Sequence, residues 1–368
     1  MRPATLTLLV MAGGTGGHVF PGLAVADLLH ARGWNVIWMG NPDSFEARTV
    51  PARGYEMAWV KFGALRGKGL LRKLLLPFSL LSGFCQARRE IRRIQPDVVL
   101  GMGGYISFPG GMMAALSGRP LVIHEQNSIA GLANRVLAGV AKRIVCGFPD
   151  ALRNSVWAGN PVRAEIAHLP PPAERFADRP AGAPIRLLVL GGSLGAAALN
   201  DIVPRGLGLI PEAERPQVVH QAGAKHLAQL QANYAAAGVR AECVDFIEDM
   251  AGAYAWADLV LCRAGALTVA ELAAAGVASI LVPYPYAVDD HQTANARFLT
   301  AAGGAILLPQ AEMTPESVSL IRNYTRGQLL QMAERARALA KPEAAETVAQ
   351  ICEVLVRPAS GSGEQHAA

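Results

Sequence analysis

Short runs of apolar residues alternate along the whole chain with longer segments whose apolar residues recur every three or four positions. The runs have the length of β-strands, and their near-continuous hydrophobicity is typical of parallel strands buried on both faces. The longer segments have the period of helices that cover such a sheet. The predicted strands lie at residues 6–12, 35–40, 97–103, 120–126, 143–148, 185–192, 217–223, 241–247, 259–265 and 278–285. The pattern therefore predicts an α/β protein with parallel sheets.

The same plan of strand, glycine-rich loop and helix occurs twice, at residues 8–24 and again at residues 187–200. A chain of 368 residues also exceeds the size at which a single core stops growing. Between the two copies, residues 163–184 are too rich in proline for a regular element. We therefore predict two doubly wound domains, over residues 1–162 and 163–342.

Two further segments follow the second domain. Residues 343–356 have the pattern of a helix, which we expect to pack back on the first domain. The last residues, 357–368, are small and polar, and we predict that they are disordered.

The composition excludes several classes of protein. The chain is 51% hydrophobic with a mean hydropathy of +0.25, yet its apolar run at 74–84 is shorter than the roughly 18–20 residues that cross a bilayer. We interpret the N-terminus as a first strand rather than a signal peptide. Its five cysteines are scattered and form no Cys-x-x-Cys pair, which indicates a reducing cytoplasm and argues against structural zinc or a disulfide framework.

The charge is unevenly distributed. Residues 1–162 contain 18 Lys and Arg against 8 Asp and Glu, a net charge of +10, whereas the rest of the chain has 16 against 21, a net charge of −5. A basic first half indicates contact with something anionic, either nucleic acid or a membrane surface.

Three glycine-rich loops follow predicted strands, at residues 13–18, 101–105 and 191–196. Glycines let a backbone approach a ligand, and the helix that follows favours anions such as diphosphate at its N-terminus. Tight packing between strand and helix also uses glycine, so each loop alone leaves both interpretations open.

A nicotinamide or flavin site is the first alternative. The G-x-G-x-x-G motif of such a site, with its later acidic residue, is matched in part by Gly101, Gly103 and Glu125. Ile106, however, occupies the place of the third glycine. The sequence also lacks a G-x-x-x-x-G-K-[ST] phosphate loop and an Asp-x-Asp metal clamp.

Residues 262–276 allow two interpretations. Thr268 and Glu271 have the spacing of a capping box, which would give them a purely structural role. Alternatively, Gly265 and the two residues after it present backbone amides to a phosphate, with Arg263 adding positive charge. Glu271 would then accept hydrogen bonds from both hydroxyls of a ribose.

Taken together, the motifs resemble those of a known family, the bacterial N-acetylglucosaminyltransferases of peptidoglycan synthesis, which belong to glycosyltransferase family 28. The resemblance covers about residues 8–356 and rests on "GGTGGHVFPGLAVA", "LRGKG", "PDVVLGMGGY", "HEQNSIAGLANR", "GNPVR", "GGSLGA", "FIEDMAGAYAWADLVLCRAGALTVAEL" and "HQTANA". It implies a GT-B fold, in which two Rossmann-like doubly wound domains face a central cleft. The first domain is expected to bind the acceptor and the second the UDP-sugar donor.

The resemblance also implies a reaction. N-acetylglucosamine passes from UDP-N-acetylglucosamine to the 4-hydroxyl of undecaprenyl-diphosphate-linked N-acetylmuramyl pentapeptide, with inversion at the anomeric carbon. No tightly bound cofactor and no obligatory active-site metal are expected, because amides at helix N-termini and Arg263 can stabilise the departing UDP.

Carried over residue by residue, the resemblance implies that Ile247 meets the uracil through its backbone, Glu271 binds the ribose and Gln292 binds sugar hydroxyls. The donor-binding residues that it implies are Thr15, Gly16, Gly17, Asn127, Arg163, Ser193, Ile247, Arg263, Ala266, Leu267, Thr268, Val269, Ala270, Glu271, Gln292 and Asn295. Two positions depart from the family, because Leu194 and His291 stand where relatives often carry glutamine. The contacts of those missing glutamines stay open.

The acceptor hydroxyl needs a base near neutral pH, and an imidazole suits that task. His18 is our candidate, and the alternative is that it only orients its loop or binds a phosphate. His124 and Glu125 are weaker candidates, since such groups at a strand end are often structural. The acceptor side is expected to include Gly103, Gly104, Tyr105, His124 and Glu125.

Residues 61–96 account for the basic first half, since they combine nine basic residues with a leucine-rich stretch. This combination favours an anionic phospholipid surface, with the protein peripheral on the cytoplasmic face of the inner membrane. The alternative is a core helix with a solvated basic face. We expect no nucleic acid as a partner, because no aromatic platform accompanies the charge. Other proteins of cell-wall synthesis and division are candidate partners.

Two other classes of function stay open from the residues alone. One is an oxidoreductase that uses NAD(P), and the other is a nucleotide-binding adaptor without catalysis.

Overall fold

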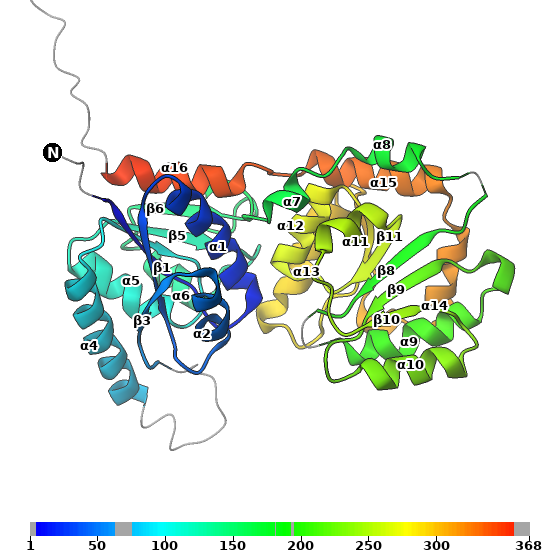
Figure 1. Cartoon of the computed structure of the whole chain (residues 1–368), viewed down its shortest axis with the longest axis horizontal. Helices are drawn as coiled ribbons and strands as arrows, with labels where there is room; N and C mark the ends of the chain where they lie inside the picture. The colour runs from blue at the N-terminus through cyan, green and yellow to red at the C-terminus, as the bar shows by residue number, and fades with distance from the viewer. Residues whose placement is uncertain (1–4, 63–75, 181, 193–194, 357–368) are drawn as a thin grey trace, which may run out of the picture. The chain divides into compact units, whose positions relative to one another are not determined.

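A computed structural model describes residues 5–62, 76–180, 182–192 and 195–356 of the chain (Figure 1). The described chain forms two compact units. Unit 1 contains residues 5–126, 130–161 and 343–356, and unit 2 contains Asn127–Ile129 and Val162–Pro342.

Unit 1 is built on a seven-stranded sheet in the order β3-β2-β1-β4-β5-β6-β7, and every strand pair is parallel. Its strands are β1 (Thr7–Met11), β2 (Asn35–Gly40), β3 (Glu56–Trp59), β4 (Val98–Gly101), β5 (Leu121–Glu125), β6 (Arg143–Cys146) and β7 (Val156–Trp157). Its helices are α1 (Gly16–Ala31), α2 (Phe45–Thr49), α4 (Leu76–Ile94), α5 (Ser107–Leu116), α6 (Leu132–Leu137) and α16 (Ala344–Val356), with a short 3₁₀ turn η1 (Pro51–Arg53).

Strand β1 shows why the central strands are apolar throughout. Leu8 and Val10 face a core formed with α1 and α16, whereas Leu9 and Met11 face a second core formed with α4 and α5. Helices therefore cover both faces of the sheet (Figure 1). A strand covered on both sides gains free energy from apolar residues at every position.

Unit 2 is built on a six-stranded parallel sheet in the order β10-β9-β8-β11-β12-β13. Its strands are β8 (Arg186–Leu190), β9 (Gln217–Gln221), β10 (Glu242–Val244), β11 (Leu259–Cys262), β12 (Ala278–Leu281) and β13 (Ala305–Leu307). Its helices are α7 (Ala164–Ala167), α8 (Pro172–Ala177), α9 (Ala197–Gly208), α10 (Leu227–Ala236), α11 (Met250–Trp256), α12 (Ala266–Ala275), α13 (His291–Thr300), α14 (Pro315–Ser319) and α15 (Arg326–Ala338). Four 3₁₀ turns complete it: η2 (Glu212–Glu214), η3 (Val288–Asp290), η4 (Gln310–Glu312) and η5 (Leu320–Asn323).

The predicted α/β class and all ten predicted strands are confirmed. Three strands were not predicted: β3, β7 and β13, and each lies at an edge of its sheet. They are short, at four, two and three residues, as edge strands often are, and their apolar residues do not stand out as a long run. Both residues of β7 are also exposed.

The expectation that residues 163–184 form no regular element is wrong, because α7 and α8 lie within them. Pro172 is the first residue of α8, where its missing N–H removes no helical hydrogen bond and its fixed φ suits the helix. Proline there starts a helix instead of preventing one.

Helix α16 belongs to unit 1 although it follows unit 2 in the sequence. Val348, Ala349 and Cys352 are buried in the same core as α1. Arg32, just after α1, forms ion pairs with Glu346 and Glu353 of α16. The tail at 357–368 lies outside the described residues.

No helix in the described part of the chain combines the length and the apolar character that a bilayer crossing requires.

Candidate functional site

The first glycine-rich loop of unit 1 joins β1 to α1 and is held by a buried carboxylate. Gly14 lies in the left-handed region, with φ +95°. The two carboxylate oxygens of Glu46, which is fully buried, accept hydrogen bonds from the backbone N–H groups of Gly14 (3.0 Å) and Asn41 (3.1 Å). Sequence reasoning missed Glu46, because its partners lie in other segments and no motif marks it.

The loop after β4 lies directly against the first loop. Gly103 and Gly104 have φ of +88° and +80°, which favour glycine. A Cβ on Gly104 would lie 2.3 Å from the carbonyl oxygen of Gly13, and a Cβ on Gly103 would lie 2.9 Å from Nδ1 of His18. The two loops therefore meet with no room for a side chain, and His18 lies where they meet.

Helix α1 begins at this junction with unpaired backbone donors. Thr15 is the N-cap residue, and its side chain makes no capping hydrogen bond. The N–H groups of Gly16 and Gly17 have no acceptor among the residues that the structure describes. His18 is in the same turn, is partly exposed, and its Nδ1 lies 3.2 Å from Oε1 of Gln126. Such a helix start suits an anionic group.

His124 and Glu125, at the end of β5, are both buried and engaged within the fold. Nε2 of His124 donates to the carbonyl of Gly159 (2.9 Å), and burial lowers the pKa of His124 to about 4. The Glu125 carboxylate accepts hydrogen bonds from the N–H of Gly131 (3.1 Å) and from Nδ2 of Asn134 (2.9 Å). This geometry gives Glu125 a role in holding the following loop and favours His18 as the candidate base.

In unit 2, helix α12 also begins with open amides. Gly265 is the N-cap residue and has no side chain to cap them. The N–H groups of Ala266, Leu267 and Thr268 have no acceptor in the described chain. The capping-box interpretation is wrong, because Thr268 lies inside the first turn and Glu271 contacts other residues.

Glu271 lies one turn further along α12 and is 7% exposed. One carboxylate oxygen lies 3.3 Å from Nη2 of Arg163, and the other accepts a hydrogen bond from the hydroxyl of Tyr254 at 3.0 Å. Burial raises the pKa of Glu271, and the Arg163 charge partly opposes that effect. Tyr254 was missed by sequence reasoning, because it lies in a short helix that showed no feature other than its apolar pattern.

The two residues before Glu271 differ from each other in burial. Val269 is fully buried in the unit, and Ala270 is half-buried. At Val269 only the backbone is available to a ligand.

Arg263, just after β11, makes several contacts within unit 2. Its Nη1 donates to the carbonyls of Val282 and Pro283, both at 3.2 Å, and its Nη2 donates to Oε1 of Gln310 at 2.6 Å. The guanidinium also lies 5.5 Å from the ring centre of Tyr284. Through these contacts, Arg263 stabilises the loop after β12.

Asn295 on α13 is fully buried and connects Asn127–Ile129 to unit 2. Its Oδ1 accepts hydrogen bonds from the N–H (2.9 Å) and the hydroxyl (2.8 Å) of Ser128, and its Nδ2 donates to Oδ1 of Asn127 (3.3 Å). Gln292, one turn earlier, is partly exposed and accepts a backbone hydrogen bond from the loop after β12. Of these side chains, Gln292 is therefore the more accessible to a ligand.

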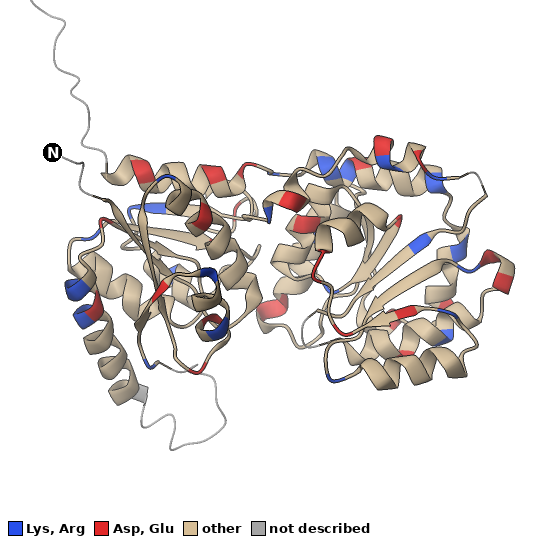
Figure 2. Cartoon of the chain, viewed as in Figure 1, with Lys and Arg blue, Asp and Glu red and all other residues tan. Residues whose placement is uncertain are grey.

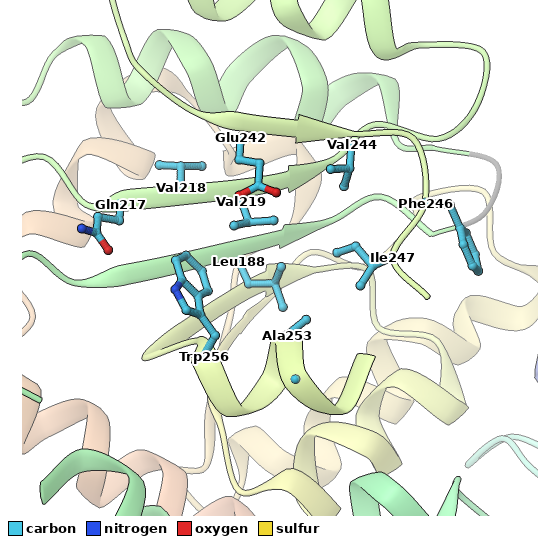
Figure 3. A pocket seen from close by; sticks show the side chains of 11 residues that line it. Leu188, Gln217, Val218, Val219, Glu242, Val244, Phe246, Ile247, Ala253 and Trp256 are labelled. Carbon is cyan, nitrogen blue, oxygen red and sulfur yellow. The ribbon is translucent and has the colours of Figure 1, made fainter. Parts of the chain in front are cut away.

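Ile247 lies at one end of a pocket of about 590 Å³ beside β8, β9, β10 and α11 (Figure 3). The residues that line it are Leu188, Gln217, Val218, Val219, Glu242, Val244, Phe246, Ile247, Gly252, Ala253 and Trp256. Most of them are apolar, and Phe246 is an exposed aromatic ring next to Ile247. This end of the pocket suits a flat, weakly polar ring.

Two of the implied positions, Ser193 and Leu194, lie outside the described residues. Within the described ranges, no three His, Cys, Asp or Glu side chains lie close enough together to hold a metal ion. Metal independence stays a prediction.

Comparison with known proteins places this geometry in context. The model of the glycosyltransferase family 28 N-terminal domain matches residues 8–146, and that of the family's C-terminal domain matches residues 186–351. A curated protein of Dechloromonas aromatica (strain RCB) is 68% identical over 95% of this chain and 99% of its own length. One of Aromatoleum aromaticum is 67% identical over 95% and 98%. Both are named UDP-N-acetylglucosamine–N-acetylmuramyl-(pentapeptide) pyrophosphoryl-undecaprenol N-acetylglucosamine transferase.

Solved structures indicate the same fold, and the first of them the same family. MurG of Acinetobacter baumannii has a TM-score of 0.82 with 40% identity, over 95% of this chain and 99% of that protein. The glycosyltransferase of kitacinnamycin, at 19% identity and a TM-score of 0.68, shows the same fold. The two Rossmann-like sheets, together with these family models and solved structures, identify a glycosyltransferase with the GT-B fold. The chain belongs to glycosyltransferase family 28, and it is a hexosyltransferase, as the sequence predicted.

Proposed function

We propose that this chain transfers N-acetylglucosamine from UDP-N-acetylglucosamine to the 4-hydroxyl of undecaprenyl-diphosphate-linked N-acetylmuramyl pentapeptide. Relatives that are 67–68% identical over almost their whole length are named as N-acetylglucosamine transferases acting between UDP-N-acetylglucosamine and N-acetylmuramyl-(pentapeptide) pyrophosphoryl-undecaprenol. The product is the disaccharide lipid precursor of peptidoglycan.

The observation that carries the proposal is the pairing of open amides with a buried carboxylate on α12. The N–H groups of Ala266, Leu267 and Thr268 suit the diphosphate, because a helix N-terminus favours anions. Glu271 follows one turn later, and a carboxylate oxygen pair suits the two vicinal hydroxyls of a ribose. The uracil would lie beside Ile247. These features match the parts of a UDP moiety.

The reaction follows from these groups. The acceptor 4-oxygen forms a bond to the anomeric carbon while the bond from that carbon to the β-phosphate oxygen breaks, which inverts the configuration. The departing UDP carries the developing negative charge, and the α12 amides stabilise it. His18 takes the proton of the acceptor hydroxyl, since an imidazole is an effective base near neutral pH.

Calorimetry with UDP-N-acetylglucosamine, UDP-glucose, UDP-N-acetylgalactosamine and NADH, with and without Mg²⁺, tests the donor half. We expect selective binding of UDP-N-acetylglucosamine that does not require Mg²⁺. Glu271→Ala should weaken it by about 10-fold or more, since hydrogen bonds to a charged group contribute roughly 1.5–3 kcal/mol each. Glu212→Ala, which changes an exposed glutamate of the same unit, serves as the matched control.

Binding of NADH in preference to the UDP-sugars, or equal affinity for the three sugars, would overturn the proposal. A transfer assay with the lipid-linked acceptor then tests the whole reaction. If the donor binds but no disaccharide forms, the chain transfers the sugar to an acceptor other than this one.

For the partner surface, we infer that α4 rests on anionic phospholipid at the cytoplasmic face of the inner membrane. The inner face of α4 packs into the core through Ala87 and Ile91, as the core-helix alternative required. Near its start, however, Phe78 and Leu81 are 71% and 62% exposed.

The other end of α4 is basic. Arg88, Arg89 and Arg92 are exposed there (Figure 2). Apolar and basic side chains together favour an anionic surface more than either kind alone. The basic residues at 66, 68, 72 and 73 lie outside the described part of the chain.

Sedimentation with vesicles tests this surface. We expect binding to phosphatidylglycerol vesicles that is weaker with phosphatidylcholine alone and weaker again at high salt. Phe78→Ser with Leu81→Ser should reduce binding several-fold, whereas Leu209→Ser, at an exposed leucine of unit 2, should not. Equal binding to both lipids would refute the inference. Contact with other proteins of cell-wall synthesis and division stays a prediction that co-purification would test.

A further inference from the structure

Gln126 is a buried polar residue that no part of the proposed mechanism has used. It follows β5 directly and is 1% exposed. Its side-chain Nε2 donates to the carbonyl of Met102 at 2.6 Å, and its Oε1 lies 3.2 Å from Nδ1 of His18. Its own backbone carbonyl accepts a hydrogen bond from Nδ2 of Asn160 at 3.0 Å. Contacts at both its nitrogen and its oxygen thus fix the side-chain amide of Gln126 within unit 1.

These contacts determine where the proton on His18 lies. The Met102 carbonyl can only accept a hydrogen bond, so the amide nitrogen of Gln126 must face it. The amide oxygen therefore faces His18, and an amide oxygen also only accepts. Nδ1 of His18 must then carry the hydrogen, and in a neutral imidazole the lone pair is left on Nε2.

Gly103 makes room for this contact. A Cβ there would lie 2.9 Å from Nδ1 of His18 and 3.2 Å from Oε1 of Gln126, and its φ of +88° disfavours any other residue. Three separate segments, after β1, β4 and β5, therefore meet to orient one imidazole ring.

We infer that Gln126 is a positioning residue, which fixes His18 in the tautomer that presents Nε2 to the acceptor hydroxyl. This inference rests on the proposed role of His18 as the base. Because the partner of Nδ1 is a neutral amide, it orients the ring without adding a negative charge that would favour the protonated imidazolium.

The titratable groups on the elements around His18 are compatible with this arrangement. His124 and Glu125 of β5 are buried and engaged within the fold, and burial keeps His124 neutral near pH 7. Glu46 of α2 accepts the N–H of Gly14, and Tyr105 follows the second loop. Gln126 is the residue whose contact with the ring of His18 fixes its tautomer.

Gln126→Met is the main test, because methionine has a similar shape but offers no strong acceptor to Nδ1. We expect kcat to fall by about 10- to 100-fold, the lower part of what a positioned general base contributes, with KM for UDP-N-acetylglucosamine unchanged. Gln126→Glu should not restore kcat, because its carboxylate places an acceptor against the Met102 carbonyl and adds a negative charge that favours the imidazolium. Gln86→Met on α4 is the control for the same chemical change at another glutamine of unit 1.

Nitrogen NMR of histidine-labelled protein reads the tautomer without any turnover. The ring signals of His18 are identified by their loss in His18→Gln. We expect Nδ1 to be protonated in the wild type and the proton to redistribute to Nε2 in Gln126→Met. The inference fails if the wild type carries the proton on Nε2, or if Gln126→Met keeps kcat within twofold.

These outcomes are separate from failure of the proposed function. If the wild type makes no disaccharide, the function is wrong, while the NMR result still tests the tautomer. If His18→Gln keeps full activity, His18 is not the base, and Gln126 then has no role in catalysis whatever the tautomer.

Discussion

The Glu271 carboxylate is buried, and a nearby positive charge balances its negative charge only in part. Among the residues that the structure describes, its charged partner is Arg163, at the long distance of 3.3 Å, and it also accepts a hydrogen bond from the Tyr254 hydroxyl. Burial therefore raises the pKa of Glu271 above its ordinary value. A ribose that donates two hydrogen bonds to the charged carboxylate would compensate part of that cost, so donor binding and ionisation of Glu271 are linked.

The pH dependence of donor binding tests this linkage. Because the pKa of Glu271 is raised, lowering the pH protonates it sooner than an exposed glutamate, and affinity for UDP should fall toward acidic pH. We expect Glu271→Gln to bind more weakly at pH 8 but with a flatter dependence between pH 8 and pH 5. Calorimetry at several pH values measures both slopes, and parallel slopes would contradict the linkage.

At the scale of elements, Glu46 on the short helix α2 connects the ends of two strands. It holds Gly14 after β1 and Asn41 after β2. A helix of five residues has little stability of its own, so these charged hydrogen bonds and its packing hold it in place. The loop that presents His18 therefore depends on an element outside it.

Glu46→Ala should leave the N–H groups of Gly14 and Asn41 without their acceptor. We expect the free energy of unfolding to fall by about 3 kcal/mol, the order of two hydrogen bonds to a charged group. Transfer activity should fall even below the unfolding transition, because the first loop loses its support. Glu56→Ala, which removes an exposed glutamate of β3, is the control, and equal effects of the two changes in urea unfolding would refute the role of Glu46.

At the scale of the whole molecule, the chain leaves unit 1 and returns to it at the end. Helix α16 completes the core beside α1, so the core of unit 1 cannot form fully before α16 has been synthesised. The stability of unit 1 therefore depends on residues more than 300 positions away in the sequence, such as Glu346 beside Arg32.

Two valines of α16 allow a matched test. Val348 is fully buried, whereas Val354 on the same helix is 63% exposed. We expect Val348→Ala to lower the free energy of unfolding by about 2 kcal/mol, through lost burial and the cavity left behind, and Val354→Ala by less than about 0.5 kcal/mol. UDP affinity should stay unchanged in both, because the groups proposed to bind the nucleotide, the α12 amides, Glu271 and Ile247, belong to unit 2. Equal destabilisation of the two variants would contradict the packing of α16.

The sequence by itself determined the central strands, the class of fold and the family. Strands such as β1 and β11 are buried on both faces, and that burial requires apolar runs which are visible without a structure. The edge strands β3 and β13, of four and three residues, were not predicted, and neither were α7 and α8, which lie among the prolines of residues 163–184.

Only the tertiary structure decided what the candidate side chains contact. The motifs marked His18 and Glu271, but their partners Gln126 and Tyr254 come from other elements, and a hydrogen bond between distant segments leaves no periodic pattern. The same holds for Arg263, whose contacts with carbonyl oxygens no motif revealed, and whose role at the diphosphate stays a prediction. Burial is encoded locally by hydrophobicity, whereas the geometry of polar contacts exists only once the chain has folded.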